Sequence, residues 1–401
     1  MKVIAILEHS ITGGGGFNQA LNAILQMKKI CKGRFEFEVF STHAENYAHL
    51  QKLGISSVIF SYSLMDKLLA KIGINSLWQA IQSRIKIIGS FEKKLIKHKC
   101  DLVYFTTPSG YVASLQKLNY ITTIWDTCHR DTPEFPEVRN FNQFLIREKN
   151  ISNYLAAAIT VIVDSESLAN SISFRYGVDR SRLLPMPFSP SPFLDLDKSK
   201  SLREVMIKYK LDEGYFFYPA QFWAHKNHIR ILEALLILNN NKKQHKIVFV
   251  GSDKGNRPHL EEFVKNNNLD SQVSFLGFVP ADDMYGLYEG CHAVIMPTYF
   301  GPTNLPPLEA WMHKKPLIYS IYFINQTKDA AVLIDPDDAH DIAKAITKSM
   351  DKDFCEELIK LGSKRVQELN DEREASEADL LVRLKKFEKR LHCWKINKDF
   401  Q

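Results

Sequence analysis

Residues 296–316 read MPTYFGPTNLPPLEAWMHKKP and join the end of a strand to a proline-rich loop and a helix. The apolar run before Pro297 predicts a short strand, and residues 308–313 predict the opening of a helix. Backbone N–H groups around Thr303–Leu305 then form a cradle for a phosphate at the helix start. Glu309 is placed to accept two hydrogen bonds from a ribose diol. A plain structural turn fits the same pattern.

Two series of short apolar runs alternate with helical stretches, which is typical of βαβ units and parallel sheets. Strands are predicted at 3–7, 36–40, 58–60, 102–105, 120–124 and 159–163 in the first series and at 215–218, 246–250, 273–276, 293–296 and 317–319 in the second. Residues 185–192 contain four prolines and form the predicted hinge, because proline continues neither a helix nor a central strand. We therefore expect an α/β fold with two doubly wound domains, whose ligands bind beyond the carboxyl ends of the strands.

Length and composition describe an ordinary globular enzyme. At 401 residues the chain exceeds the usual size of one hydrophobic core, so two domains are expected. With 45% hydrophobic and 24% charged residues, it has no apolar run near the ~20 residues of a membrane-spanning helix. The apolar run after Lys2 is too short for a secretory signal, so a cytoplasmic protein is predicted. The six cysteines are widely separated, which favours reduced thiols used in packing over a metal site.

The segment 301–310, Gly-Pro-Thr-Asn-Leu-Pro-Pro-Leu-Glu-Ala, resembles the donor-site signature of family-4 retaining glycosyltransferases, which have the GT-B fold. The resemblance covers most of the C-terminal half and, loosely, the N-terminal half. It continues in the order and spacing of the family at 316–318, 329–336 and 341–346, and upstream residues 218–227 resemble the family's other phosphate-binding turn. It implies two Rossmann-like doubly wound domains facing a central cleft. Residues 1–188 form the acceptor domain, on which a C-terminal helix at about 378–401 packs, and residues 200–377 form the donor domain.

The resemblance also implies a site for a nucleotide-diphosphate sugar. In it Lys226 neutralises the diphosphate and Glu309 binds the ribose, and no metal or other cofactor is needed because Lys226 and the helix N-terminus supply positive charge. The implied donor-binding residues are Gly14, Gly15, Gly16, Gln221, Lys226, Gly251, Phe278, Thr303, Asn304, Leu305 and Glu309.

The chain departs from the family pattern at two positions. Gln221 stands where many relatives carry an arginine, which leaves more of the electrostatic work to Lys226. Gly301 stands where the family carries the first of two glutamates separated by seven residues, the second being Glu309. The departure at Gly301 bears on the contacts to the donor sugar.

Four consecutive glycines, 13–16, follow the first predicted strand and let the backbone approach a ligand before a helix begins at Phe17. A dinucleotide fingerprint does not fit, because Asn18 and Gln19 occupy the places where its third glycine would fall. No P-loop motif is present either. By resemblance the loop lines the acceptor and donor-phosphate side of the cleft, and a turn without a ligand is the alternative.

The segment 125–134, Trp-Asp-Thr-Cys-His-Arg-Asp-Thr-Pro-Glu, resembles the acceptor-domain loop that carries a His-Asp pair near the reacting sugar. The register leaves Asp126 and His129 both open as the functional group, and a structural histidine is the alternative. The predicted catalytic residues are His129, Asp126 and Lys226. Retention of configuration is implied by the resemblance alone, with the acceptor attacking from the leaving-group face and no protein nucleophile.

Positive charge is concentrated in residues 61–99. Eight Lys or Arg and only two acidic residues there give a net charge of +6, equal to the excess of the whole chain. Apolar residues at helical spacing accompany them, and such a helix can lie on an anionic bilayer. A helix packed on the sheet is the alternative. Nucleic acid is not an expected partner, because the basic residues are local and lack a recognition motif.

Together these features predict a retaining glycosyltransferase that moves a sugar from a UDP-, GDP- or dTDP-linked donor to a glycan or lipid-linked glycan acceptor. The expected setting is assembly of a bacterial surface polysaccharide, O-antigen or capsule, in the cytoplasm at the inner face of the membrane. Two alternatives stay open. One is a non-catalytic GT-B subunit of a glycan-assembly complex, and the other is a sugar-nucleotide epimerase.

Overall fold

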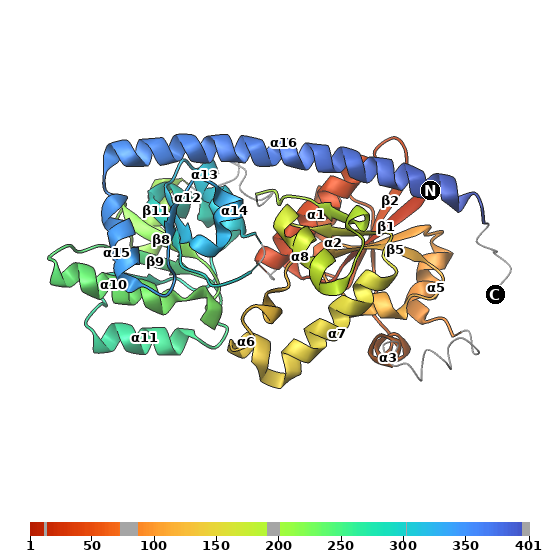
Figure 1. Ribbon diagram of the computed structural model, residues 1–401, viewed down its shortest axis with the longest axis horizontal. Helices are drawn as coiled ribbons and strands as arrows, with labels where there is room; N and C mark the ends of the chain where they lie inside the picture. The colour runs from red at the N-terminus through yellow and green to blue at the C-terminus, as the bar shows by residue number, and fades with distance from the viewer. Residues whose placement is uncertain (12–13, 73–86, 191–200, 302, 395–401) are drawn as a thin grey trace. The chain divides into compact units, whose positions relative to one another are not determined.

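The computed structural model describes residues 1–11, 14–72, 87–190, 201–301 and 303–394. Its contacts divide the chain into two compact units that interleave along the sequence. Unit 1 contains residues 1–127, 144–188 and 371–401, and unit 2 contains residues 128–143 and 189–370. Each unit is an α/β body around a parallel sheet (Figure 1). No helix within these described parts is both long and apolar enough to cross a membrane.

Unit 1 has a seven-stranded parallel sheet in the order β3-β2-β1-β4-β5-β6-β7. Its strands are β1 Lys2–Leu7, β2 Glu36–Ser41, β3 Ser57–Ile59, β4 Leu102–Phe105, β5 Asn119–Ile124, β6 Thr160–Val163 and β7 Leu183–Pro185. Its helices include α1 Gly15–Cys31, α2 Asn46–Lys52, α3 Leu64–Ile72, α5 Ser90–Lys97, α7 Gln143–Ala156 and α8 Glu166–Tyr176. Residues 3–7 of β1 are fully buried, as expected for a parallel strand covered on both faces.

Unit 2 has a six-stranded parallel sheet in the order β10-β9-β8-β11-β12-β13. Its strands are β8 Tyr215–Pro219, β9 Ile247–Val250, β10 Val273–Phe275, β11 Cys291–Met296, β12 Leu317–Ser320 and β13 Val332–Ile334. Its helices include α6 Pro136–Arg139, α9 Leu202–Tyr209, α10 His228–Asn240, α11 Arg257–Asn266, α12 Ala281–Gly290, α13 Leu305–Met312, α14 Ile324–Thr327 and α15 Ala339–Lys348. In Figure 1 the sheet lies between α12 and α13 on one face and α10 and α11 on the other.

All eleven predicted strands are present, each within two residues of its predicted bounds. The prediction missed β7 and β13, which are three-residue strands at the edges of the two sheets. Pro185, the first residue of the predicted hinge at 185–192, ends β7, and the two units divide inside that range, between Phe188 and Ser189. Proline is tolerated there because an edge strand does not need every backbone N–H in its ladder. The end of the predicted hinge lies outside the described residues.

The helix predicted to open at 308–313 begins three residues earlier, at Leu305. Pro306 and Pro307 lie in its first turn, where backbone N–H groups have no partner inside the helix and a proline costs little. The prediction treated both prolines as part of the loop. The structure shows that they start the helix.

The last helix, α16, runs from Lys352 to Leu391, and its residues from Asp371 onward belong to unit 1. Glu377 accepts hydrogen bonds from Gln26 Nε2 at 3.1 Å and from Lys29 Nζ at 2.7 Å. Arg383 donates to the carbonyl of Ser181 at 2.7 Å. The segment 128–143, which the prediction assigned to the first domain, is grouped with unit 2. The predicted limits of the two domains, 1–188 and 200–377, stay a prediction.

Candidate functional site

Four loops of unit 2 meet at the carboxyl edge of its sheet, after β8, β9, β10 and β11. The backbone of Phe222 donates to Ser252 at 3.1 Å, which joins the first two loops. The backbone N–H of Gly251 donates to the carbonyl of Gly277 at 2.8 Å, which joins the second loop to the third. Because the carboxyl edge is where open α/β sheets bind ligands, this loop cluster is the candidate site.

Lys226 and Asn304 come together in this cluster, as predicted for neighbouring parts of one site. Lys226 ends a short 3-10 helix, Ala224–Lys226, and its Nζ donates to Asn304 Oδ1 at 3.1 Å. Asn304 is the N-cap residue of α13 and donates through Nδ2 to the hydroxyl of Tyr319 at 2.6 Å. Its carbonyl accepts a hydrogen bond from Gln326 Nε2 at 3.0 Å. The ammonium group is thereby held at the positive end of a helix, which favours an anion.

The candidate cradle at the start of α13 consists of the backbone amides that the sequence analysis named. Pro306 and Pro307 have no N–H, so the amides that remain at the helix start are those of Thr303, Asn304 and Leu305. The side chain of Leu305 is buried, so the backbone is the part of this residue available to a ligand.

Glu309 has a partner inside unit 2. It is only 7% exposed, and the hydroxyl of Tyr288 donates to its Oε2 at 2.5 Å. Burial and the neighbouring carboxylate raise the pKa of Tyr288 well above its usual value, so this phenol stays a donor. Tyr288 stacks on His313 with ring centroids 5.0 Å apart, which fixes the donor. A carboxylate oxygen has two lone pairs, so the predicted role of Glu309 in ribose binding stays a prediction alongside this structural one.

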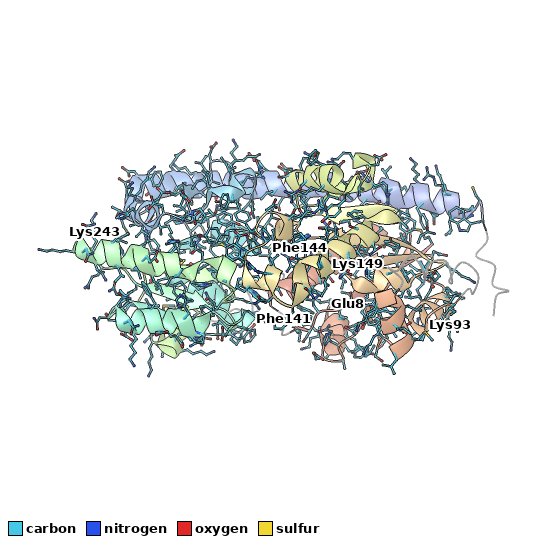
Figure 2. All side chains as sticks on the ribbon, turned by 60° about the horizontal axis from the view of Figure 1, so that its bottom comes forward. Glu8, Lys93, Phe141, Phe144, Lys149 and Lys243 are labelled. Carbon is cyan, nitrogen blue, oxygen red and sulfur yellow. The ribbon has the colours of Figure 1, made fainter. Side chains whose placement is uncertain are left out.

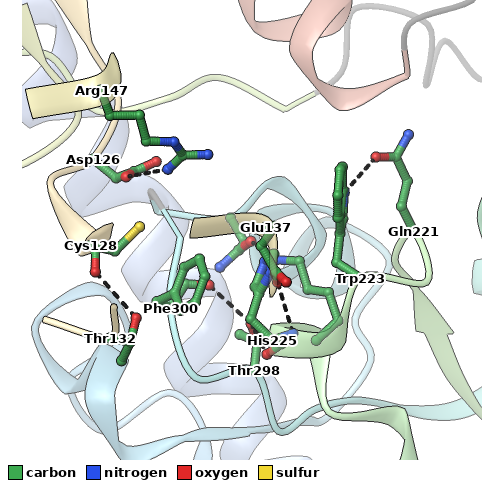
Figure 3. A network of polar contacts seen from close by, with 12 residues as sticks. Asp126, Cys128, Thr132, Glu137, Arg147, Gln221, Trp223, His225, Thr298 and Phe300 are labelled. Atoms are coloured by element: carbon green, nitrogen blue, oxygen red, sulfur yellow. Dashed lines mark hydrogen bonds and ion pairs between the residues drawn. The ribbon is translucent and has the colours of Figure 1, made fainter. Parts of the chain in front are cut away.

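The other predicted donor residues of unit 2 have distinct surroundings. Gln221 accepts a hydrogen bond from Trp223 Nε1 at 3.1 Å (Figure 3). Gly251 allows a close backbone approach, since a Cβ there would lie 2.6 Å from the carbonyl carbon of Ala220. Phe278 is 59% exposed, which leaves an aromatic face free of the core. Their direct contact with a donor stays a prediction.

The glycine loop of unit 1 is described from Gly14 onward, and Gly13 lies outside the described residues. Gly14 is the N-cap residue of α1, with φ +67°. A Cβ on Gly16 would lie 3.0 Å from the ring of His9, so a larger residue there would require the ring to shift. This contact gives Gly16, one of the three glycines predicted to bind the donor, a packing role that involves no ligand.

The two predicted catalytic residues of the 125–134 segment differ in accessibility. Asp126 belongs to unit 1, and its side chain is 24% exposed and pairs with Arg147 at 3.8 Å. His129 belongs to unit 2, lies in a short 3-10 helix, Cys128–Arg130, and has no exposed surface. Asp126 is thus partly exposed and His129 is buried, and contact of either with the reacting sugar stays a prediction.

Sequence reasoning missed Glu137 and His225, which form a buried pair at the carboxyl edge of unit 2. Their positions are 88 residues apart in the chain, so no local motif links them. Among the residues that the structure describes, no group of three or more His, Cys, Asp or Glu side chains is placed to hold a metal. Independence from metal stays a prediction.

Comparisons with known proteins give a family match for part of the chain and a fold for most of it. Residues 204–365 match the family model described as glycosyl transferases group 1. The O-antigen chain mannosyltransferase B of Escherichia coli is 24% identical over 233 residues, 56% of this chain and 60% of the relative. The O-antigen chain mannosyltransferase RfbU of Salmonella typhimurium is 23% identical over 188 residues, 46% of this chain and 49% of the relative. The chain thus spans about half to three fifths of the length of these relatives.

Among solved structures, HepE (Alr3699) of Anabaena in complex with UDP-glucose resembles the whole chain. The TM-score is 0.70 at 15% sequence identity, and the likeness covers 95% of this chain and 99% of HepE. At this identity the likeness shows the fold and nothing finer. The chain therefore has the GT-B fold, and its residues 204–365 match the group 1 glycosyl transferases.

Proposed function

We propose that this chain is a glycosyltransferase that moves a sugar from a nucleotide-diphosphate sugar onto a glycan acceptor. The observation that carries the proposal is the ammonium of Lys226, held by Asn304 at the N-terminus of α13. When the glycosidic bond to the donor breaks, negative charge grows on the departing diphosphate. A fixed cation and helix amides at that point stabilise the transition state more than the ground state.

We propose further that the reaction follows the retaining course of family 4 and needs no metal. In this scheme Glu309 binds the ribose, and Asp126 or His129 contacts the reacting sugar. The acceptor attacks from the face that the diphosphate leaves, so no protein nucleophile takes part. The anomeric configuration of the product, read by NMR, tests this part separately.

The substrates are proposed from the names of similar proteins. The two curated relatives are O-antigen mannosyltransferases, and the HepE structure holds UDP-glucose. These names support a UDP-, GDP- or dTDP-linked sugar as donor and a growing bacterial surface polysaccharide, free or lipid-linked, as acceptor. They favour transfer to a glycan over the epimerase alternative.

The test is a calorimetric titration of the wild type with UDP, GDP, dTDP and CMP. We expect selective binding of one nucleoside diphosphate, and binding about 10- to 100-fold weaker in Glu309→Ala, because two hydrogen bonds to a charged acceptor are lost. Glu357→Ala, an exposed glutamate on α16, is the matched control and should bind as the wild type does. If the wild type binds none of the four nucleotides, the chain is a non-catalytic subunit.

The basic segment 61–99 supports a second partner, an anionic membrane surface. On α3 the apolar side chains of Leu64, Met65 and Leu68 are 85%, 47% and 48% exposed, so this helix does not bury its whole apolar face. On α5 the side chains of Phe91 and Leu95 are buried, so this helix packs on the sheet as the alternative expected. The two helices therefore differ: α3 exposes apolar side chains, as a membrane-surface helix does, and α5 packs on the sheet. Residues 73–86 of the segment lie outside the described residues.

The acidic residues of this segment are not on its surface. Asp66 is fully buried and accepts backbone hydrogen bonds from Ser63 and Phe91. Glu92 is fully buried and accepts backbone hydrogen bonds from residues 116, 117 and 118. Because both carboxylates are buried, the exposed side chains in the described part of the segment are more strongly positive than the net charge counted from its sequence. This arrangement supports attraction to anionic lipid, at about 1 kcal/mol per basic residue near the surface.

Charge reversal on α5 tests the membrane proposal. Lys93 and Lys97 are exposed, and Lys93 points outward in Figure 2. Lys94 is left unchanged, because it donates to the carbonyl of Ile59 at 3.3 Å and lies 5.7 Å from the ring centroid of Phe40. The double variant Lys93→Glu/Lys97→Glu should bind phosphatidylglycerol-containing vesicles at least about tenfold more weakly in a sedimentation assay.

The matched control is Lys242→Glu/Lys243→Glu, which reverses two exposed lysines of unit 2. It should keep the vesicle affinity of the wild type. Equal losses in both double variants would mean that net charge alone drives binding, and no loss in the α5 variant would remove the membrane from the proposal.

A further inference from the structure

A carboxylate from α6 holds the turn that carries Lys226. One oxygen of Glu137 accepts a hydrogen bond from the backbone N–H of His225 at 3.0 Å, and the same oxygen meets Nδ1 of the His225 ring (Figure 3). The side chains are only 7% and 11% exposed, respectively. A single carboxylate therefore fixes both the backbone and the ring of the residue directly before Lys226.

The ring and carbonyl of His225 are held from the other side by the loop after β11. The imidazole stacks on Phe300 with ring centroids 4.0 Å apart and planes 15° apart. The carbonyl of His225 accepts hydrogen bonds from the backbone of Tyr299 at 3.0 Å and from Thr298 Oγ1 at 3.3 Å. Phe135, two residues before Glu137, packs on Phe300 at 5.3 Å. The turn is thus clamped between α6 and the loop that leads to Asn304.

The residue after Lys226 is fixed as well. Asn227 is buried, has φ +57°, and donates through Nδ2 to the carbonyls of Pro297 at 3.1 Å and Pro336 at 2.8 Å. The backbone of Lys226 is therefore held on both sides, while its Nζ meets Asn304. A cation that is placed before the ligand arrives needs no reorganisation when charge develops, which is where such groups act most strongly.

We propose that Glu137 is a positioning residue of the donor site, which aims Lys226 at the diphosphate by clamping His225. The inference rests on the proposed function and deepens it. Glu137 is negative near a site for an anion, so by electrostatics alone its removal should tighten diphosphate binding. A positioning role predicts instead that removing Glu137 weakens diphosphate binding. Burial raises the pKa of Glu137, but the hydrogen bonds from His225 outweigh it and lower the pKa overall. The carboxylate is therefore charged at neutral pH, where electrostatic repulsion and positioning predict opposite effects of its removal.

The test is a double-mutant cycle on nucleoside diphosphate affinity. Wild type, Glu137→Ala, Lys226→Ala and the double variant are titrated at pH 7.5 with whichever of UDP, GDP or dTDP the wild type binds, and with the matching nucleoside. We expect Glu137→Ala to weaken diphosphate binding about tenfold and to leave nucleoside binding unchanged. In the Lys226→Ala background the same change should have no further effect, because the cation that it positions is gone.

Two further variants guard against a change in folding. Glu137→Gln keeps an oxygen for the backbone N–H and loses the charge, so it should fall between wild type and Glu137→Ala. Asn140→Ala alters an exposed, uncharged residue of the same segment and should bind as the wild type does. If Glu137→Ala does not fold, Glu137→Gln carries the cycle. Hydrogen exchange of the His225 amide, faster in either Glu137 variant, reports the clamp without any ligand.

The outcomes separate this inference from the proposed function. Tighter or unchanged diphosphate binding in both Glu137 variants, effects additive with Lys226→Ala, or an equal loss of nucleoside binding each overturns the positioning role alone. A wild type that binds no nucleoside diphosphate overturns the proposed function and the inference with it.

Discussion

Lys226→Ala is expected to lower kcat/KM for the nucleotide sugar by about 10²–10³, the usual cost of removing one fixed group that stabilises transition-state charge. The ammonium meets Asn304 Oδ1 at 3.1 Å, and the helix that Asn304 caps adds its positive end. Gln221 brings no charge to replace it. Because the negative charge grows as the diphosphate leaves, most of the loss should appear in kcat rather than in KM.

Steady-state kinetics with the donor identified by calorimetry measure this effect. Lys344→Ala removes an exposed lysine of α15 in the same unit and should change kcat/KM by less than about twofold. A Lys226→Ala enzyme with wild-type kcat would show that the diphosphate is neutralised elsewhere. A loss confined to KM would mean that Lys226 binds substrate and transition state equally well.

Lys226 and Asn304, named separately from the sequence and in contact in the structure, show how far sequence reasoning can place a site. Each residue lies in a loop that follows a predicted strand. These two strands, β8 and β11, are neighbours in the sheet, with Phe217 opposite Val294. Parallel neighbours end at the same edge, so their loops meet. The strand order itself is a long-range property, and the structure supplies it.

The parts that the sequence did not reveal depend on long-range burial. The contact of Glu137 with His225 joins residues 88 positions apart, and no periodic pattern in the sequence indicates it. His129 was named because its loop resembles a family segment, and the sequence did not predict that it has no exposed surface, because burial is decided by the neighbours that pack on the loop. The edge strand β7 escaped detection because Pro185 is a strong signal against a strand everywhere except at an edge.

Gly251→Ala is expected to destabilise unit 2 by about 3 kcal/mol or more, the largest stability effect that we predict. A Cβ at this position would lie 2.6 Å from the carbonyl carbon of Ala220 and 2.7 Å from Cα of Gln221, and it would also meet the Ala220 oxygen. All three atoms belong to backbone, so no side-chain rotation relieves the overlap. The loops after β8 and β9 must separate, which also breaks the hydrogen bond from Phe222 to Ser252.

Urea-induced unfolding, followed by tryptophan fluorescence, measures the loss against a matched glycine. Gly255→Ala, four residues on, has φ +101° and no heavy atom within 4 Å of the added Cβ, so it should cost only the backbone strain, about 1–2 kcal/mol. If both variants lose the same amount, close approach is not what Gly251 provides. A Gly251→Ala protein with wild-type stability but weakened diphosphate binding would instead assign the glycine to direct contact with the donor. Since the clash falls on Ala220 and Gln221, on the loop that leads to Lys226, we expect stability and diphosphate affinity to fall together.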